Sequence, residues 1–182
     1  MEFEGIKHIA LSDITPSQLY ISAEKLRRVE EWFSPEAIAS EPLPVRDFGN
    51  GRYTFTDGHT RAMCAHMAGL TNIPVIYDRD DIVASAEGEM LYRMDIEWCA
   101  RFGIHTIADL AGRIISSENY NILWRARCDA GYELMTRTTF AQRAAIAAHH
   151  SGLVLYGMSA DGKTMHFEDL SGKTYQFQEA IP

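Results

Sequence analysis

The stretch that decides the fold is "TDGHTRAMCAHMAGLTNIPV", residues 56–75. Five consecutive residues, Asp57 to Arg61, are polar or conformationally permissive, and an apolar, alanine-rich run follows them. This order predicts a strand end, a tight turn, a helix over residues 59–68 and a buried strand after it. Gly69 is expected to end the helix, since glycine favours the position after a helix C-terminus. The turn itself has two interpretations, an ordinary helix start or a binding site for phosphate.

Both interpretations follow from the chemistry of a helix N-terminus. The first turn exposes N–H groups without partners and the positive end of the helix dipole. Gly58 allows a tight turn and the close approach of a ligand, His59 and Thr60 add hydrogen-bonding groups, and the planar guanidinium of Arg61 suits phosphate. Residues 58–61 therefore have the chemistry of an anion site. In the alternative, Asp57 caps the helix and residues 59–61 form its solvated first turn.

The flanking sequence predicts the order βαββαβ up to residue 81. A short strand is expected within residues 6–14, and a helix capped by Ser22 over residues 23–33, ended or bent at Pro35. Residues 42–59 predict a strand, a hairpin turn at Gly49–Asn50–Gly51 and a second strand. The strand "NIPVIYD" completes this region.

After residue 81 the sequence predicts helices and then a three-strand meander. Expected helices cover residues 82–103 with a weak point at Gly88, 105–114 capped by Thr106, 116–135 capped by Ser116 or Ser117, and the alanine-rich 139–150. The meander spans 153–177, with turns at Asp161–Gly162 and Ser171–Gly172. We expect an α+β (mixed α/β) fold with a domain at 1–82, a helical segment at 83–150 and a meander at 151–182. In the alternative, residues 83–182 pack as one body with residues 1–82.

Composition limits the function classes. The formal net charge is -8, which disfavours sequence-independent binding to a nucleic-acid backbone. The three cysteines, Cys64, Cys99 and Cys128, are far apart and odd in number, so we expect reduced thiols and no metal site. The apolar stretches are shorter than a bilayer span and no signal pattern begins the chain. A soluble, cytoplasmic protein without membrane contacts is therefore predicted, and no residue is assigned as a metal ligand.

Residues 6–80 resemble the ParB/sulfiredoxin superfamily. Gly58 matches the glycine of its GERR-like box and Arg61 the second arginine, while His59 and Thr60 replace the residues between. The residues that follow match the superfamily at the same spacing, namely Ala68, Gly69, Ile73 and Pro74. The resemblance implies a small mixed sheet with helices and a box that binds nucleotide phosphates. Sulfiredoxins place a phosphate-contacting lysine at the start of the helix facing the box, and Lys25 holds the similar place here.

Within the superfamily, the wording Asp57-Gly58-His59-Thr60-Arg61 is closest to the "DGHHR" box of free serine kinases. This implies a phosphotransferase that uses ATP or ADP, with CTP as a further candidate and magnesium as a companion, acting on a small hydroxyl substrate. Asp57 would be the catalytic residue, which could position a hydroxyl or hold magnesium. Gln18, however, occupies the place of the glutamate base, and glutamine accepts no proton. Asp13 or Glu24 are geometric substitutes.

Two other activities are weighed against the kinase. Gly58 stands at the place of the sulfiredoxin cysteine, which argues against sulfiredoxin activity, and Cys64 fits a small buried residue. A non-catalytic ParB-like regulator or DNA-associated interaction protein is the alternative function. Residues 105–137 have a faint helix-turn-helix pattern, but they carry no net charge and the turn lacks glycine. We expect a structural helical pair there, and the nucleotide base, the acceptor and the oligomeric state are not identified.

Overall fold

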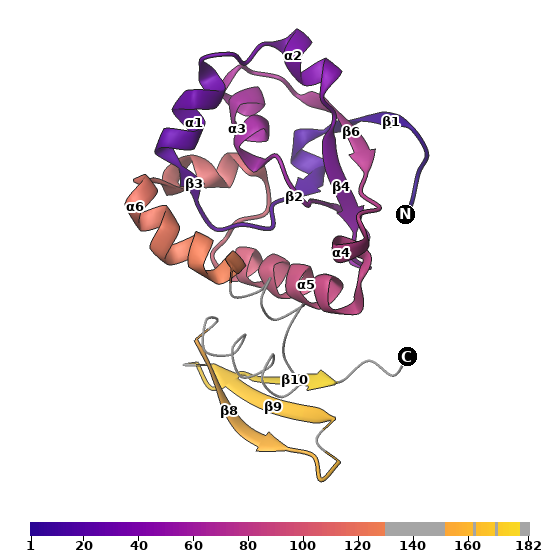
Figure 1. Ribbon diagram of the computed structural model, residues 1–182, viewed down its shortest axis with the longest axis vertical. Helices are drawn as coiled ribbons and strands as arrows, with labels where there is room; N and C mark the ends of the chain where they lie inside the picture. Colours follow the sequence, from indigo (N-terminus) through magenta and orange to yellow (C-terminus); the bar gives the residue numbers. More distant parts are fainter. Residues whose placement is uncertain (130–151, 162, 170, 179–182) are drawn as a thin grey trace. The chain divides into compact units, whose positions relative to one another are not determined.

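The computed structural model describes residues 1–129, 152–161, 163–169 and 171–178 and has an α+β fold (Figure 1). The chain forms two compact units, Met1–Trp124 and Arg125–Pro182. The first unit holds a small mixed sheet with helices, and the second holds an antiparallel sheet. The predicted fold class is confirmed. The division of the chain at residues 82 and 150 stays a prediction, and residue 150 lies outside the described part.

The mixed sheet of the first unit has five strands in the order β1-β6-β4-β5-β2. Their bounds are β1 Ile6–Ala10, β2 Ile14–Thr15, β4 Leu43–Asp47, β5 Tyr53–Phe55 and β6 Asn72–Tyr77. Strand β6 pairs antiparallel with β1 and parallel with β4, while β5 pairs antiparallel with β4 and parallel with β2. The predicted hairpin is confirmed, since Gly49 and Gly51 have φ of 86° and 75° between β4 and β5. The 3-10 turn η1, Leu11–Asp13, separates β1 from β2 within the predicted first strand.

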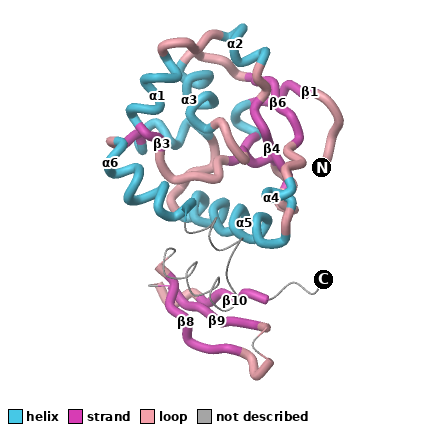
Figure 2. Tube along the Cα trace, in the orientation of Figure 1, coloured by secondary structure: helices cyan, strands magenta, loops and turns pink. Residues whose placement is uncertain are grey.

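Three helices of the first unit are α1 Ala23–Glu30, α2 Pro35–Ser40 and α3 His59–Met67. Ser22 caps α1 by accepting a hydrogen bond from the Lys25 N–H at 3.3 Å, as the sequence predicts. Helix α1 is shorter than expected, because Ser34 and Pro35 begin a separate helix instead of ending a longer one. Helix α3 matches its predicted range and is followed by Gly69 at φ 77°. Helices α1 and α3 pack against each other (Figure 2).

Residues 81–125 add further helices. They form α4 Asp81–Ala84, α5 Ala86–Arg101, the 3-10 helix η2 Ile107–Arg113, α6 Ser117–Tyr120 and the π-helical η3 Asn121–Arg125. The single predicted helix over 82–103 is wrong, because the chain breaks at Ser85 and not at Gly88. The Ser85 hydroxyl accepts the Gly88 N–H at 3.0 Å and so caps α5. The predicted caps by Thr106 and Ser116 are confirmed.

Long-range contacts join these later helices to the elements formed by the first 80 residues. Strand β3, Ile21–Ser22, pairs in parallel with β7, Ile114–Ile115. Helix η2 packs against α3, which is itself buried through Ala62, Met63 and Ala65. Residues up to Trp124 therefore share one compact unit with the mixed sheet. Trp124 is buried and Trp98 packs on the core, whereas Trp32 is 49% exposed.

The second unit confirms the predicted meander. Strands β8 Leu153–Met158, β9 Thr164–Asp169 and β10 Thr174–Gln178 pair antiparallel in the order β10-β9-β8. The turn at Gly172 has φ 80°, as the sequence predicts, and Leu153, Met165 and Phe167 form a small core. The predicted helix over 139–150, with its His149–His150 pair, lies outside the described residues. No helix in the part of the chain that the structure describes has the length and apolar character to cross a membrane.

Candidate functional site

The start of α3 carries the candidate site, and Gly58 sets its geometry. Gly58 is the N-cap residue with φ 79° and ψ 14°, a left-handed conformation, and no side chain caps the helix. A Cβ at this position would lie 2.8 Å from Leu43 Cδ2. The first bond of the helix runs from the Ala62 N–H to the Gly58 carbonyl at 2.9 Å. Among the described residues, the three N–H groups before Ala62 have no hydrogen-bond partner.

Asp57 does not cap α3. Its side chain is 76% exposed and lies 3.9 Å from the Arg61 guanidinium, measured from Asp57 Oδ2 to Arg61 Nη2. The prediction that Asp57 caps the helix is therefore wrong, whereas the choice between an ordinary helix start and a phosphate site stays a prediction. A carboxylate at the helix N-terminus still interacts favourably with the helix dipole, and Asp57 stays in the solvent beside the uncapped N–H groups.

His59 is turned away from solvent. It is 5% exposed, and its Nε2 accepts a hydrogen bond from the Ser17 N–H at 3.0 Å. Burial lowers the pKa of His59 from its ordinary value of 6.5 to about 4, the positive charge of Lys25 lowers it further, and the charge of Asp57 opposes the shift. The ring is therefore neutral near pH 7, and because Nε2 accepts, Nδ1 carries the proton. Of the groups of His59, Nε2 is engaged by Ser17, whereas the backbone N–H has no hydrogen-bond partner among the described residues.

Arg61 is held by two carboxylates. Its side chain is 20% exposed, and Nη1 lies 3.3 Å from Glu41 Oε2 in the loop before β4. Glu41 is itself 66% exposed, so this pair and the longer one to Asp57 are screened by water and weakly held. An anion at the start of α3 would compete with Glu41 for the guanidinium. Thr60 is buried and follows His59 in the same turn.

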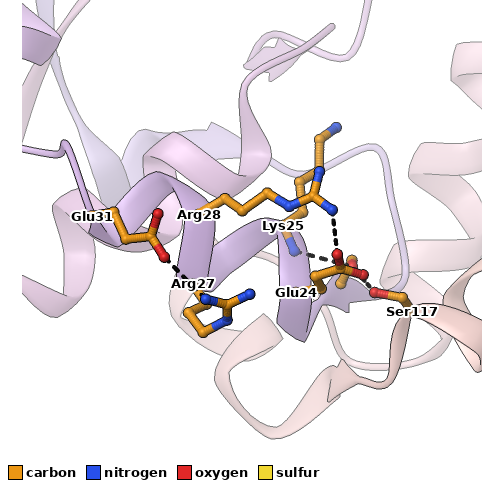
Figure 3. Close-up of polar contacts among 7 residues, drawn as sticks. Glu24, Lys25, Arg27, Arg28, Glu31 and Ser117 are labelled. Atoms are coloured by element: carbon orange, nitrogen blue, oxygen red, sulfur yellow. Dashed lines mark hydrogen bonds and ion pairs between the residues drawn. The ribbon is translucent and has the colours of Figure 1, made fainter.

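Lys25 lies on α1, which packs against α3, and its charge acts on His59. The Lys25 side chain has no ion pair among the described residues, in contrast to its neighbours on α1. Figure 3 shows these neighbours paired on the helix surface, Arg28 with Glu24 and Arg27 with Glu31. Arg28 and the Ser117 hydroxyl lower the pKa of Glu24. Among the described residues of α1, Lys25 is thus the basic residue without an ion pair, and Glu24 is not a free base.

The connector of residues 16–20 lies against the start of α3. The Ser17 hydroxyl donates to the Phe55 carbonyl at 2.7 Å, in addition to the Ser17 N–H bond with His59. Gln18 donates its amide Nε2 to the Tyr20 carbonyl at 2.9 Å, so its side chain folds back on the connector. Neither Ser17 nor Glu41 was predicted from the sequence. Ser17 and His59 are separated by 42 residues, and no local pattern marks such a pair.

Cys64 lies in an environment that does not favour a nucleophile. This cysteine is buried on α3, as predicted, and burial together with the charge of Glu30 raises the pKa of its thiol to about 11. Since the thiolate is the reactive form, this environment favours a small core residue over a nucleophile at Cys64. Among the described residues, no three His, Cys, Asp or Glu side chains gather at one point where a metal could bind.

Comparison with known proteins finds similar solved structures but shows no family for this chain. No family model and no curated protein matches the chain. The chain is similar to the crystal structure of protein Atu1540 from Agrobacterium tumefaciens, with 14% identity and a TM-score of 0.41 over 81% of this chain and 90% of that one. It is also similar to the C-terminally truncated chromosome-partitioning protein ParB from Caulobacter crescentus complexed with CTP-gamma-S. That match has 14% identity and a TM-score of 0.33, over 81% of this chain and 99% of that one.

Proposed function

We propose that the first unit is a ParB/sulfiredoxin-like module that binds the phosphates of a nucleoside di- or triphosphate at the start of α3. The observation that carries the proposal is the uncapped N-terminus of α3 behind Gly58. Three adjacent N–H groups without partners, at the positive end of a helix dipole, are suited to an anion. Gly58 allows the left-handed backbone conformation of this turn, at a position where a Cβ would clash with Leu43.

The residues around the turn have distinct roles in this proposal. The backbone N–H groups of His59, Thr60 and Arg61 donate to phosphate oxygens. The Arg61 guanidinium exchanges its weak pairing with Glu41 for a charge-assisted bond to phosphate. Lys25 supplies a second positive charge from α1. Magnesium would accompany the nucleotide, and no residue of this chain is assigned to hold it.

Titration calorimetry with ATP, ADP and CTP, each with magnesium, tests the binding. Wild-type protein is expected to release or absorb heat with at least one of these nucleotides at millimolar concentration. Lys25→Gln should weaken the affinity by roughly tenfold, since a lost charge-assisted contact is worth about 1.5 kcal/mol. Arg27→Gln, on the same helix but paired with Glu31, is the matched control and should leave the affinity unchanged. Absence of heat and of any thermal shift with all three nucleotides would contradict the proposal.

A phosphotransfer reaction at this site would use Asp57. The exposed carboxylate lies beside the proposed phosphate site, where it can accept a hydrogen bond from the hydroxyl of a small acceptor such as free serine. The hydroxyl oxygen would form the new bond to the terminal phosphorus as its proton passes to the Asp57 carboxylate. The bond between that phosphorus and the bridging oxygen would break, and the nucleotide would leave with one phosphate fewer. Phosphorus NMR of a mixture of ATP or ADP with serine reports a phosphoserine signal directly. Asp57→Asn should abolish that signal while nucleotide binding persists.

Nucleotide binding without phosphotransfer, as in a regulator that associates with DNA, is the second candidate. Gln18 favours it, because its amide is engaged with the Tyr20 carbonyl and accepts no proton. Fluorescence anisotropy with random duplex DNA at low salt separates the two candidates. Binding that weakens steeply with added salt supports the regulator. No binding, together with a phosphoserine signal, supports the kinase.

A further inference from the structure

His59 makes a contact that the proposed phosphate site does not require. Its neutral imidazole accepts the N–H of Ser17, a residue 42 positions earlier, at 3.0 Å. The Phe55 ring packs edge-on against the imidazole, with 5.6 Å between ring centroids. The Phe55 carbonyl accepts the Ser17 hydroxyl at 2.7 Å. The end of β5 and the first residue of α3 thus both hydrogen-bond Ser17. Phe55 accepts its hydroxyl and His59 accepts its N–H.

These two hydrogen bonds fix the connector, residues 16–20, beside the uncapped turn. Gln18 follows Ser17 directly, and its side-chain amide donates to the Tyr20 carbonyl. The Gln18 carbonyl in turn accepts the Cys99 thiol, 3.5 Å away on α5. The Ser17 N–H is the point where this segment is tied to α3 itself. An imidazole is suited to the task because it presents a single acceptor nitrogen while burying an apolar ring.

We propose that His59 is a positioning residue, whose unprotonated Nε2 holds the Pro16–Tyr20 connector against the start of α3 and so forms one wall of the ligand site. The contribution to ligand binding rests on the proposed function, but the contact itself does not. The His59 Nε2 then acts on the connector, while the backbone N–H of the same residue is one of the groups proposed to bind phosphate. This role differs from that of the neighbouring Thr60 and Arg61.

Amide hydrogen exchange at Ser17 tests the contact without any nucleotide. In the wild-type protein at pH 7 we expect a protected Ser17 N–H, and long-range nitrogen NMR should show His59 protonated at Nδ1 and unprotonated at Nε2. His59→Ala removes the acceptor, and the Ser17 exchange rate should rise roughly tenfold or more. His59→Gln restores an acceptor oxygen at a similar reach, and the rate should return to within about threefold of wild type.

Two control variants separate positioning from general loosening. His66→Ala changes an exposed histidine at the other end of α3 and should leave Ser17 exchange unchanged. Ser17→Ala removes the hydroxyl bond to Phe55 and keeps the N–H, so residue 17 should stay more protected than in His59→Ala. Nucleotide affinity should fall in His59→Ala and recover in His59→Gln.

Each result bears on the proposal. A fast-exchanging Ser17 amide in wild-type protein, or a His59 ring protonated at Nε2 at pH 7, would overturn it even if no variant folds. Equal protection in wild type and His59→Ala would also overturn it. A changed Ser17 rate in a protein that binds no nucleotide would support the contact and contradict the proposed function alone.

Discussion

His59 makes the stability of the first unit depend on pH. Burial lowers the pKa of this side chain from 6.5 to about 4 in the folded protein, whereas the unfolded chain keeps the ordinary value. Between these two values the unfolded state binds more protons, so folding stability falls as the pH drops from about 6.5 to about 4. The contribution is complete above pH 6.5 and amounts to at most about 3 kcal/mol. Urea unfolding at pH 7 and pH 4.5 measures it.

The His59→Gln variant isolates this dependence. Asp47 and Asp109 also have lowered pKa values, through hydrogen bonds that favour their charged forms, and their contributions are lost at a lower pH. They titrate in both proteins, so the difference between wild type and variant reports His59. The unfolding free energy of wild type minus that of the variant should therefore be smaller at pH 4.5 than at pH 7. An identical pH dependence in the two proteins would show that His59 is accessible to protons in the folded state.

Alanine substitutions at Gly58 and Gly69 distinguish two destabilising effects of an added methyl group, backbone strain and steric clash. Both have φ near 80°, so an alanine at either position is strained. At Gly58 the new Cβ would also lie 2.8 Å from Leu43 Cδ2, whereas at Gly69 nothing lies within 4 Å. We expect Gly69→Ala to cost about 1 kcal/mol and Gly58→Ala about 2–3 kcal/mol. Denaturant midpoints measure both, and equal losses would show that Leu43 moves aside freely.

At the scale of the elements, sequence patterns correctly predicted the features that depend on residues close together in the chain. The Ser22 cap, the glycines of the hairpin and the range of α3 depend on neighbours within a few residues, and all are confirmed. The pairing of Ile21 with Ile114 was not predictable, because nothing near either residue specifies a partner so distant. The same limit hid Ser17 from the site. The residues at the turn were proposed from their chemistry, and their hydrogen-bond partners became known only from the fold.

The break before α5 depends on one serine. Sequence periodicity alone continues through residues 82–103, but Ser85 has extended backbone angles and its hydroxyl accepts the Gly88 N–H. Ser85→Ala should lower the unfolding free energy by about 1 kcal/mol, the usual value of an N-cap. Ser12→Ala, which removes an exposed hydroxyl from the same unit, should change it by less than about 0.5 kcal/mol. Urea denaturation compares the two, and equal effects would show that Ser85 is not an effective cap.

At the scale of the whole molecule, the two compact units imply separable folding. The unit Met1–Trp124 contains the main core, including Phe55, Met63 and Trp124, and it also contains Lys25 and the turn at Gly58. Every contact that we assign to the site therefore lies within this unit. A shortened chain of residues 1–129 should unfold cooperatively, because its buried core is intact.

This shortened chain should also keep the protected Ser17 amide and the nucleotide affinity of the full chain within about threefold, since none of their contacts is removed. Exchange at Ser17 and calorimetry on both lengths measure the comparison. A shortened chain that folds but loses affinity would show that residues after 129 contribute to the site. A shortened chain that does not fold would show that the two units depend on each other for stability, which their separate cores argue against.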